Sequence, residues 1–143
     1  DMAIAILYYS YGGSTRTYCK WLAKDVGADL YEVVEPKRRN PVSVMLFGTD
    51  QAKKGRASKI IMPEIDWDEY EDIVIAGPIW NANPAPAVNA IIDRLPPRKN
   101  VTLILVSTAG TYVAEYAQGL IRKKGCTVSE VLSLKREEAL LEK

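Results

Sequence analysis

The stretch Ala3-Ile-Ala-Ile-Leu-Tyr-Tyr-Ser-Tyr-Gly-Gly-Ser-Thr15 decides the fold. Its first seven residues form a nearly continuous apolar run, which is typical of a strand that is buried on both faces. The paired glycines break this strand, and Ser14 or Thr15 can cap a helix that follows. Apolar side chains then recur at helical spacing up to Gly27, which is placed to end the helix. The stretch therefore predicts a buried strand, a tight turn and a helix.

The same alternation of apolar runs and helical patterns continues along the chain. Further strands are expected over residues 29–35, 73–77, 101–107 and 127–134, and helices over 86–95 and 113–124. A helix is also expected within 40–59, although glycines interrupt its spacing. Strands that alternate with helices across short loops predict an α/β fold, a parallel sheet with helices on both faces. No repeat or linker interrupts the chain, so one domain over residues 1–143 is expected.

The composition is that of a globular protein, with 48% hydrophobic and 26% charged residues among 143. The net charge of +1 gives no reason to expect nucleic-acid binding. The chain contains no histidine, which excludes a Ser-His-Asp triad and histidine metal ligands. With no obvious set of catalytic acids and bases and no metal site, we expect any chemistry to come from a bound cofactor.

The cysteines and the apolar runs bear on localisation. Cys19 and Cys126 form no C-x-x-C pair, so a reduced, cytoplasmic protein is expected. The apolar runs are much shorter than the ~20 residues that span a bilayer, and the N-terminus does not have the pattern of a secretory signal. We therefore expect no membrane insertion.

Three loops follow the expected strands at the edge where α/β sheets bind ligands. In residues 10–15, hydroxyl groups and two glycines lie beside a helix N-terminus, which suits an anion. The loop has neither the lysine of a P-loop nor the G-x-G-x-x-G spacing, so a phosphomonoester held without a metal is favoured. The alternative interpretation is an ordinary capped helix after a glycine-rich turn.

The other two loops, 77–83 and 107–112, carry aromatic residues. Trp80 is expected on an exposed connection, where it can stack on a flat ring; alternatively, it packs over the sheet edge. Asn81 and Asn83 tolerate left-handed backbone geometry. The third loop offers small residues with backbone amides. Tyr112 either covers a ring or begins the next helix as a core residue.

Together the three loops resemble the flavodoxin family of FMN-binding electron carriers. Ser10-Tyr-Gly-Gly-Ser-Thr15 is similar to the family's [ST]-x-[TS]-G-x-T phosphate loop, and Gly77-Pro-Ile-Trp-Asn-Ala-Asn-Pro-Ala-Pro86 is similar to its ring-flanking loop. The resemblance implies a three-layer sandwich with a five-stranded parallel sheet in the order 2-1-3-4-5. It also implies noncovalently bound FMN and electron transfer between redox partner proteins, by a monomer or weak dimer.

The resemblance assigns residues to parts of the cofactor. The implied cofactor-binding residues are Ser10, Tyr11, Gly12, Gly13, Ser14 and Thr15 for the phosphate; Pro78, Ile79, Trp80, Asn81, Ala82 and Asn83 beside the ring; and Ser107, Thr108, Ala109, Gly110 and Tyr112 at its pyrimidine end. Two residues depart from the family pattern. Gly12 stands where threonine is usual, and Ala82 stands where many relatives carry glycine, whose peptide contacts the flavin N5.

Charge and size leave other functions open. The acidic residues of 64–72 and the basic residues of 37–59 form separate blocks, which are either solvated surface or a docking face for a redox partner. An FMN-dependent NAD(P)H:quinone-type reductase is one alternative, although such enzymes usually need a wider pocket. A flavodoxin-like binding module that has lost flavin is another.

Overall fold

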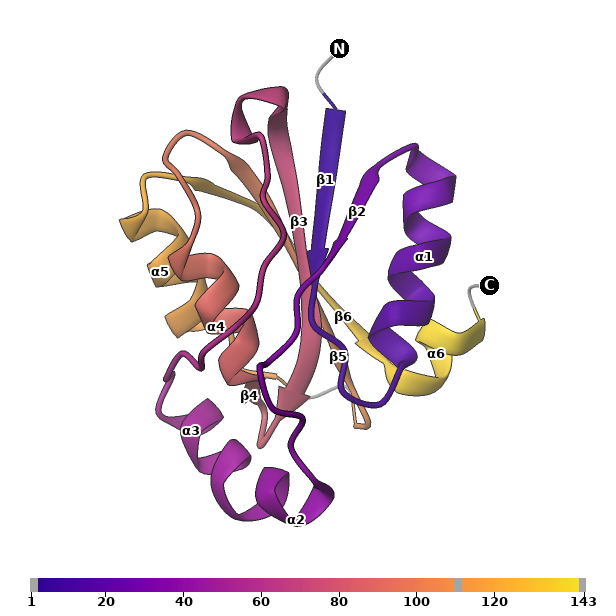
Figure 1. Ribbon diagram of the computed structural model, residues 1–143, viewed down its shortest axis with the longest axis vertical. Coiled ribbons are helices and arrows are strands. Elements are labelled where there is room, and N and C mark those ends of the chain that lie inside the picture. Colours follow the sequence, from indigo (N-terminus) through magenta and orange to yellow (C-terminus); the bar gives the residue numbers. More distant parts are fainter. Residues whose placement is uncertain (1–2, 110–111, 142–143) are drawn as a thin grey trace.

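The computed structural model describes residues 3–109 and 112–141, and a twisted parallel sheet lies at the centre of this part (Figure 1). Its long strands are β1 (Ala3–Tyr8), β2 (Asp29–Glu32), β3 (Tyr70–Trp80), β5 (Asn100–Ser107) and β6 (Thr127–Lys135). They pair in parallel in the order β2-β1-β3-β5-β6. Numbered along the chain, these long strands have the predicted order 2-1-3-4-5, so that prediction is confirmed.

Helices cover both faces of the sheet (Figure 1). On one side lie α1 (Ser14–Val26) and α6 (Arg136–Leu141); on the other lie α3 (Thr49–Lys53), α4 (Pro86–Asp93) and α5 (Glu115–Lys123). A one-turn 3₁₀ helix, η2 (Trp67–Glu69), precedes β3. Within the described residues, no helix combines the length and the apolar character that crossing a bilayer requires.

The apolar run of β1 feeds two hydrophobic cores, one on each face of the sheet. Ala5 and Leu7 belong to the core under α4 and α5, and Ile6 and Tyr8 belong to the core under α1. Successive side chains of a strand point to opposite faces, so a strand covered by helices on both faces must be apolar throughout. This explains why the first residues of the chain predicted a buried strand.

The segment expected to contain a helix within 40–59 does so. α2 (Pro41–Ser43), a π-helical turn η1 (Val44–Gly48) and α3 follow one another without a break. The side chain of Asn40 caps the start by accepting a hydrogen bond from the Ser43 amide at 2.7 Å. Gly48 has ordinary helical angles and does not interrupt the segment, whereas Gly55, with φ of 68°, lies just after its end.

The prediction that residues 77–83 form a loop is wrong, because β3 continues to Trp80. Residues 77 and 78 pair with Leu105 and Val106 of β5. The chain then reverses into the short antiparallel strand β4 (Asn83–Pro84). Asn81 and Ala82 make the turn with φ of 52° and 63°, the pattern of a two-residue type I′ hairpin. Asn83, expected to tolerate a left-handed backbone, lies in β4 instead.

Candidate functional site

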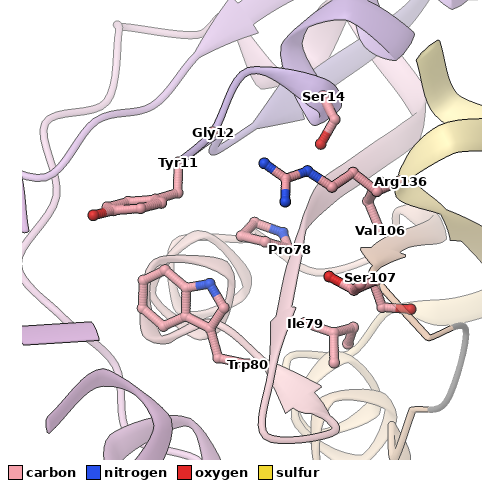
Figure 2. A pocket seen from close by; sticks show the side chains of 10 residues that line it. Tyr11, Gly12, Ser14, Pro78, Ile79, Trp80, Val106, Ser107 and Arg136 are labelled. Carbon is pink, nitrogen blue, oxygen red and sulfur yellow. The ribbon is translucent and has the colours of Figure 1, made fainter. Parts of the chain in front are cut away.

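A cavity of about 130 Å³ lies at the carboxyl ends of the central strands. It is lined by Tyr11, Gly12 and Ser14 after β1, by Pro78, Ile79 and Trp80 at the end of β3, by Val106, Ser107 and Thr108 at the end of β5, and by Arg136 of α6 (Figure 2). The strand order reverses between β1 and β3, and ligands of open α/β sheets bind beside such a point. The structure therefore brings members of all three predicted loops to one cavity.

The loop after β1 is ordered by the side chain of Ser10. Its Oγ accepts hydrogen bonds from the amides of Gly13, at 3.1 Å, and Arg16, at 3.2 Å. Gly13 is the N-cap residue of α1 and has φ of 100°, a conformation that favours glycine, so the N-cap residue itself provides no side chain to the first-turn amides. The amides of Ser14 and Thr15 are in the first turn and therefore have no acceptor within the helix. They are available to an anion.

The predicted phosphate hydroxyls do not all face the cavity. Ser14 lines it, and its hydroxyl points into it (Figure 2). Thr15 is only 2% exposed and is absent from the lining, and the Ser10 oxygen already accepts two amides. Ser14 is therefore the member of this set that is best placed to donate to a ligand.

Trp80 is buried, so the expectation that it lies on an exposed connection is wrong. It is 9% exposed and packs edge-on against Tyr9 and Tyr11, with ring centroids 6.2 and 5.8 Å away. The Arg39 guanidinium lies 5.4 Å from its ring centroid, and a Cβ added at Gly48 would come within 3.0 Å of its Cζ3. The indole forms a wall of the cavity and is not a free lid (Figure 2).

A largely buried ion pair between Arg39 and Glu35 lies beside Trp80. Arg39 Nε lies 2.9 Å from Glu35 Oε1, with side chains only 13% and 7% exposed, and Arg39 also donates to Gln51 of α3 at 2.9 Å. The Tyr9 hydroxyl donates to the same Glu35 oxygen at 2.9 Å. Burial, followed by the negative charge of Glu35, raises the pKa of Tyr9 above its ordinary value. The phenol therefore remains a hydrogen-bond donor at physiological pH.

The third loop approaches the hairpin after β3. The Val113 amide donates to the Ala82 carbonyl at 2.6 Å, which ties the two connections together. Ser107 and Thr108 line the cavity, whereas Ala109 and Tyr112 do not. Tyr112 is 38% exposed and precedes α5, so it is not a core residue of that helix.

Of the remaining predicted site residues, Asn81, Ala82 and Asn83 form the hairpin turn and lie outside the cavity lining. Gly110, with its neighbour at 111, lies outside the described residues.

Sequence analysis missed Arg136. It directly follows β6, so it begins at the carboxyl edge of the sheet, and its guanidinium points into the cavity beside Ser14 (Figure 2). The signal that was available is its position, since a residue that follows the last parallel strand emerges at the same edge as the other loops.

Several solved structures share this architecture. A flavoprotein from Lactobacillus acidophilus NCFM, solved in complex with FMN, has a TM-score of 0.79 over 93% of each chain at 23% identity. A putative flavoprotein from Bacteroides eggerthii DSM 20697 has a TM-score of 0.78 at 17% identity, covering 97% of this chain and 94% of that one. Oxidised Flavodoxin 2 from Bacillus cereus has a TM-score of 0.51 at 14% identity, covering 97% and 93%.

The chain has a flavodoxin-like fold. The three-layer α/β sandwich inferred from the loops is thereby confirmed. No family model matches the chain, and no curated protein sequence does.

In this flavodoxin-like fold, the donors of the cavity suit a ligand with one anionic end. Helix amides, the Ser14 hydroxyl and the Arg136 guanidinium lie on one side, and Trp80 and Ile79 form an aromatic and apolar side. No carboxylate is present among the described residues that line it. Small-molecule pockets usually hold about 300–1,000 Å³, so this cavity can enclose an anionic group while a larger ring would extend across its mouth.

Proposed function

We propose that this chain binds FMN noncovalently and carries electrons between redox partner proteins. The observation that carries the proposal is that phosphate donors and an aromatic wall share one cavity at the point where the strand order reverses. The flavoprotein from Lactobacillus acidophilus, which aligns over 93% of this chain, was crystallised with FMN. That likeness supports the choice of flavin over other aromatic phosphates.

Different residues of the chain would contact different parts of FMN. The amides of Ser14 and Thr15 and the Ser14 hydroxyl would hold the phosphate, because the helix N-terminus favours negative charge there. Trp80 and Ile79 would contact the ring and exclude water from one side, and Ser107 and Thr108 would face its polar edge. When bound, FMN supplies reversible one- and two-electron transfer.

A carrier fits the site better than a reductase does. A carrier needs only an exposed ring edge, whereas a reductase must also bind a nicotinamide donor and an acceptor. The cavity holds about 130 Å³, and no acidic side chain lines it within residues 3–109 and 112–141. The described residues that line it therefore offer no carboxylic acid or base to a second substrate, which favours electron transfer to protein partners as the proposed role.

Flavin titration tests the proposal. The apoprotein is titrated with FMN and with riboflavin, following flavin fluorescence and the visible spectrum. We expect FMN to bind at least tenfold more tightly than riboflavin, and its fluorescence to be quenched because Trp80 and Tyr11 line the cavity. Ser14→Ala should weaken FMN binding by about 1 kcal/mol. The matched control is Ser129→Ala, at an exposed position of β6.

The same preparation separates the alternatives. A carrier reduced with dithionite should pass electrons to cytochrome c, and it should not oxidise NAD(P)H in the presence of a quinone. Steady turnover of NAD(P)H with a quinone would mean that the protein is a reductase and not a carrier. A protein that binds neither flavin would leave only the binding module.

A further inference from the structure

The C-terminal segment of the chain crosses the carboxyl edge of the sheet. β6 ends at Lys135, and α6 then packs against α1 (Figure 1). Ala139 of α6 is fully buried in the same core as Tyr18 of α1. The Lys135 amide donates to a Glu138 carboxylate oxygen at 2.9 Å, which closes the first turn. The backbone of Arg136 is therefore held beside the phosphate loop by packing and by a cap.

Gly12 leaves room for the Arg136 side chain. A Cβ added at Gly12 would lie 2.9 Å from Arg136 Nη2, which is too close for an undisturbed contact. Gly12 does not have the positive φ that requires glycine at Gly13. The guanidinium therefore occupies the volume that a Cβ at 12 would take, and a side chain at 12 would displace the end of the Arg136 side chain.

Within residues 3–109 and 112–141, the guanidinium that faces the cavity has no counter-ion. Two other arginines of the chain pair with carboxylates: Arg16 with Glu32, and Arg39 with Glu35. For Arg136, no ion pair or hydrogen bond joins the side chain to any residue in the described ranges. Beside it lie the Ser14 hydroxyl and the first amides of α1, which also favour an anion (Figure 2).

We propose that Arg136 is a charged ligand of the FMN phosphate, and that Gly12 is the residue that admits it. The inference rests on the proposed function and adds the group that selects a phosphorylated flavin. An arginine fork can donate two hydrogen bonds to one phosphate, and such charge-assisted bonds are about twice as strong as neutral ones. In this chain, a guanidinium thus takes the place of the threonine hydroxyl that the flavodoxin pattern has at position 12.

Arg136→Gln tests the inference in the apoprotein, with dissociation constants measured by flavin fluorescence for FMN and riboflavin. We expect FMN binding to weaken about tenfold to a hundredfold, as for a lost hydrogen bond to a charged group. Riboflavin, which has no phosphate, should bind within twofold of the parent. Arg136→Lys keeps the charge without the fork and should lie between the two. Arg122→Gln, at an exposed position of α5, is the matched control and should change neither constant.

Salt gives a second readout, since FMN affinity of the parent should fall more steeply with ionic strength than that of Arg136→Gln. The apoproteins should share one melting temperature, because Arg136 is exposed. If Arg136→Gln retains the parent's preference for FMN over riboflavin, the inference is wrong and the proposed function stands. Equal losses for both flavins would also overturn it, because they would place Arg136 away from the phosphate. A parent that binds neither flavin would overturn both.

Discussion

Ala82 occupies a position where its side chain costs stability. It is the second residue of the β3–β4 turn and has φ of 63°, in the left-handed region that L-residues other than asparagine and aspartate rarely enter. The bond from the Val113 amide to the Ala82 carbonyl, 2.6 Å long, needs this turn. We therefore expect Ala82→Gly to stabilise the protein.

The size of the effect follows from two opposing terms. The left-handed conformation costs an L-residue about 1–2 kcal/mol that glycine does not incur. Glycine gives the unfolded chain more freedom, which costs about 0.4–1 kcal/mol, and the half-buried methyl group of Ala82 contributes a few tenths more. A net gain of about 0.5 kcal/mol in the free energy of unfolding remains. For a chain of this length, that raises the melting temperature by about 2 °C.

Thermal unfolding followed by circular dichroism measures this shift, and urea unfolding checks its sign. Asn81→Gly is the matched control, because Asn81 has φ of 52° in the same turn but asparagine tolerates that region. Its melting temperature should change by less than that of Ala82→Gly. Unchanged stability in Ala82→Gly, or an equal gain in both variants, would refute the argument from backbone strain.

Three further perturbations test the packing around the site. Gly77→Ala would place a Cβ 2.2 Å from Val88 Cγ2, so we expect the free energy of unfolding in urea to fall by about 1–3 kcal/mol. Adding Val88→Ala should restore part of this loss. Glu35→Gln leaves the largely buried Arg39 guanidinium uncompensated and should lower the free energy of unfolding by about 3 kcal/mol. Asp50→Asn, which breaks an exposed ion pair, should lower it by less than about 0.5 kcal/mol. Burial raises the pKa of Cys19 to about 12 from 9.0, so the unfolded thiol ionises first and stability should fall between these pH values. The urea midpoint of Cys19→Ala should fall less over that range than the parent's, and an identical fall would contradict this.

The centre of the sheet could be predicted because its central strands β1 and β5 are buried on both faces. A parallel strand under two layers of helices must be apolar throughout, and β1 and the β5 run are recognisable for that reason. The three ligand loops followed from the same reasoning, since parallel strands end at one edge. Strand order, by contrast, came from the resemblance to flavodoxins and not from the residues themselves.

The end of β3 could not be predicted, because Pro78 is typical of a loop or an edge. The register of the sheet explains why a proline is tolerated at position 78 within the strand. β1 pairs with β3 only as far as Ala76, so Pro78 lies beyond that neighbour; it pairs with Val106 of β5, and its carbonyl accepts a hydrogen bond from the Ala85 amide. A missing amide does least harm at such a position, and the strand continues past it to the hairpin.

The burial of Trp80 and the position of Arg136 depend on contacts between residues distant in sequence. Trp80 is covered by Gly48 and by Arg39, which lie on another segment and make no local pattern with it. Arg136 meets Gly12 only because α6 packs on α1. Hydrophobic periodicity describes each segment by itself, so neither contact could be deduced from it.

The basic block of residues 37–59 does not act as one surface. The Arg38 side chain is exposed, with its guanidinium 4.4 Å from the centroid of the Tyr11 ring, and Arg39 is largely buried against Glu35. Both side chains therefore pack against aromatic residues that line the cavity, but only the Arg39 charge is committed within the fold. Lys53 is also exposed, on α3. If basic side chains attract an acidic redox partner, the contribution must come from exposed members of the block, such as Lys37, Arg38 and Lys53, because the paired and largely buried charge of Arg39 adds little to long-range attraction.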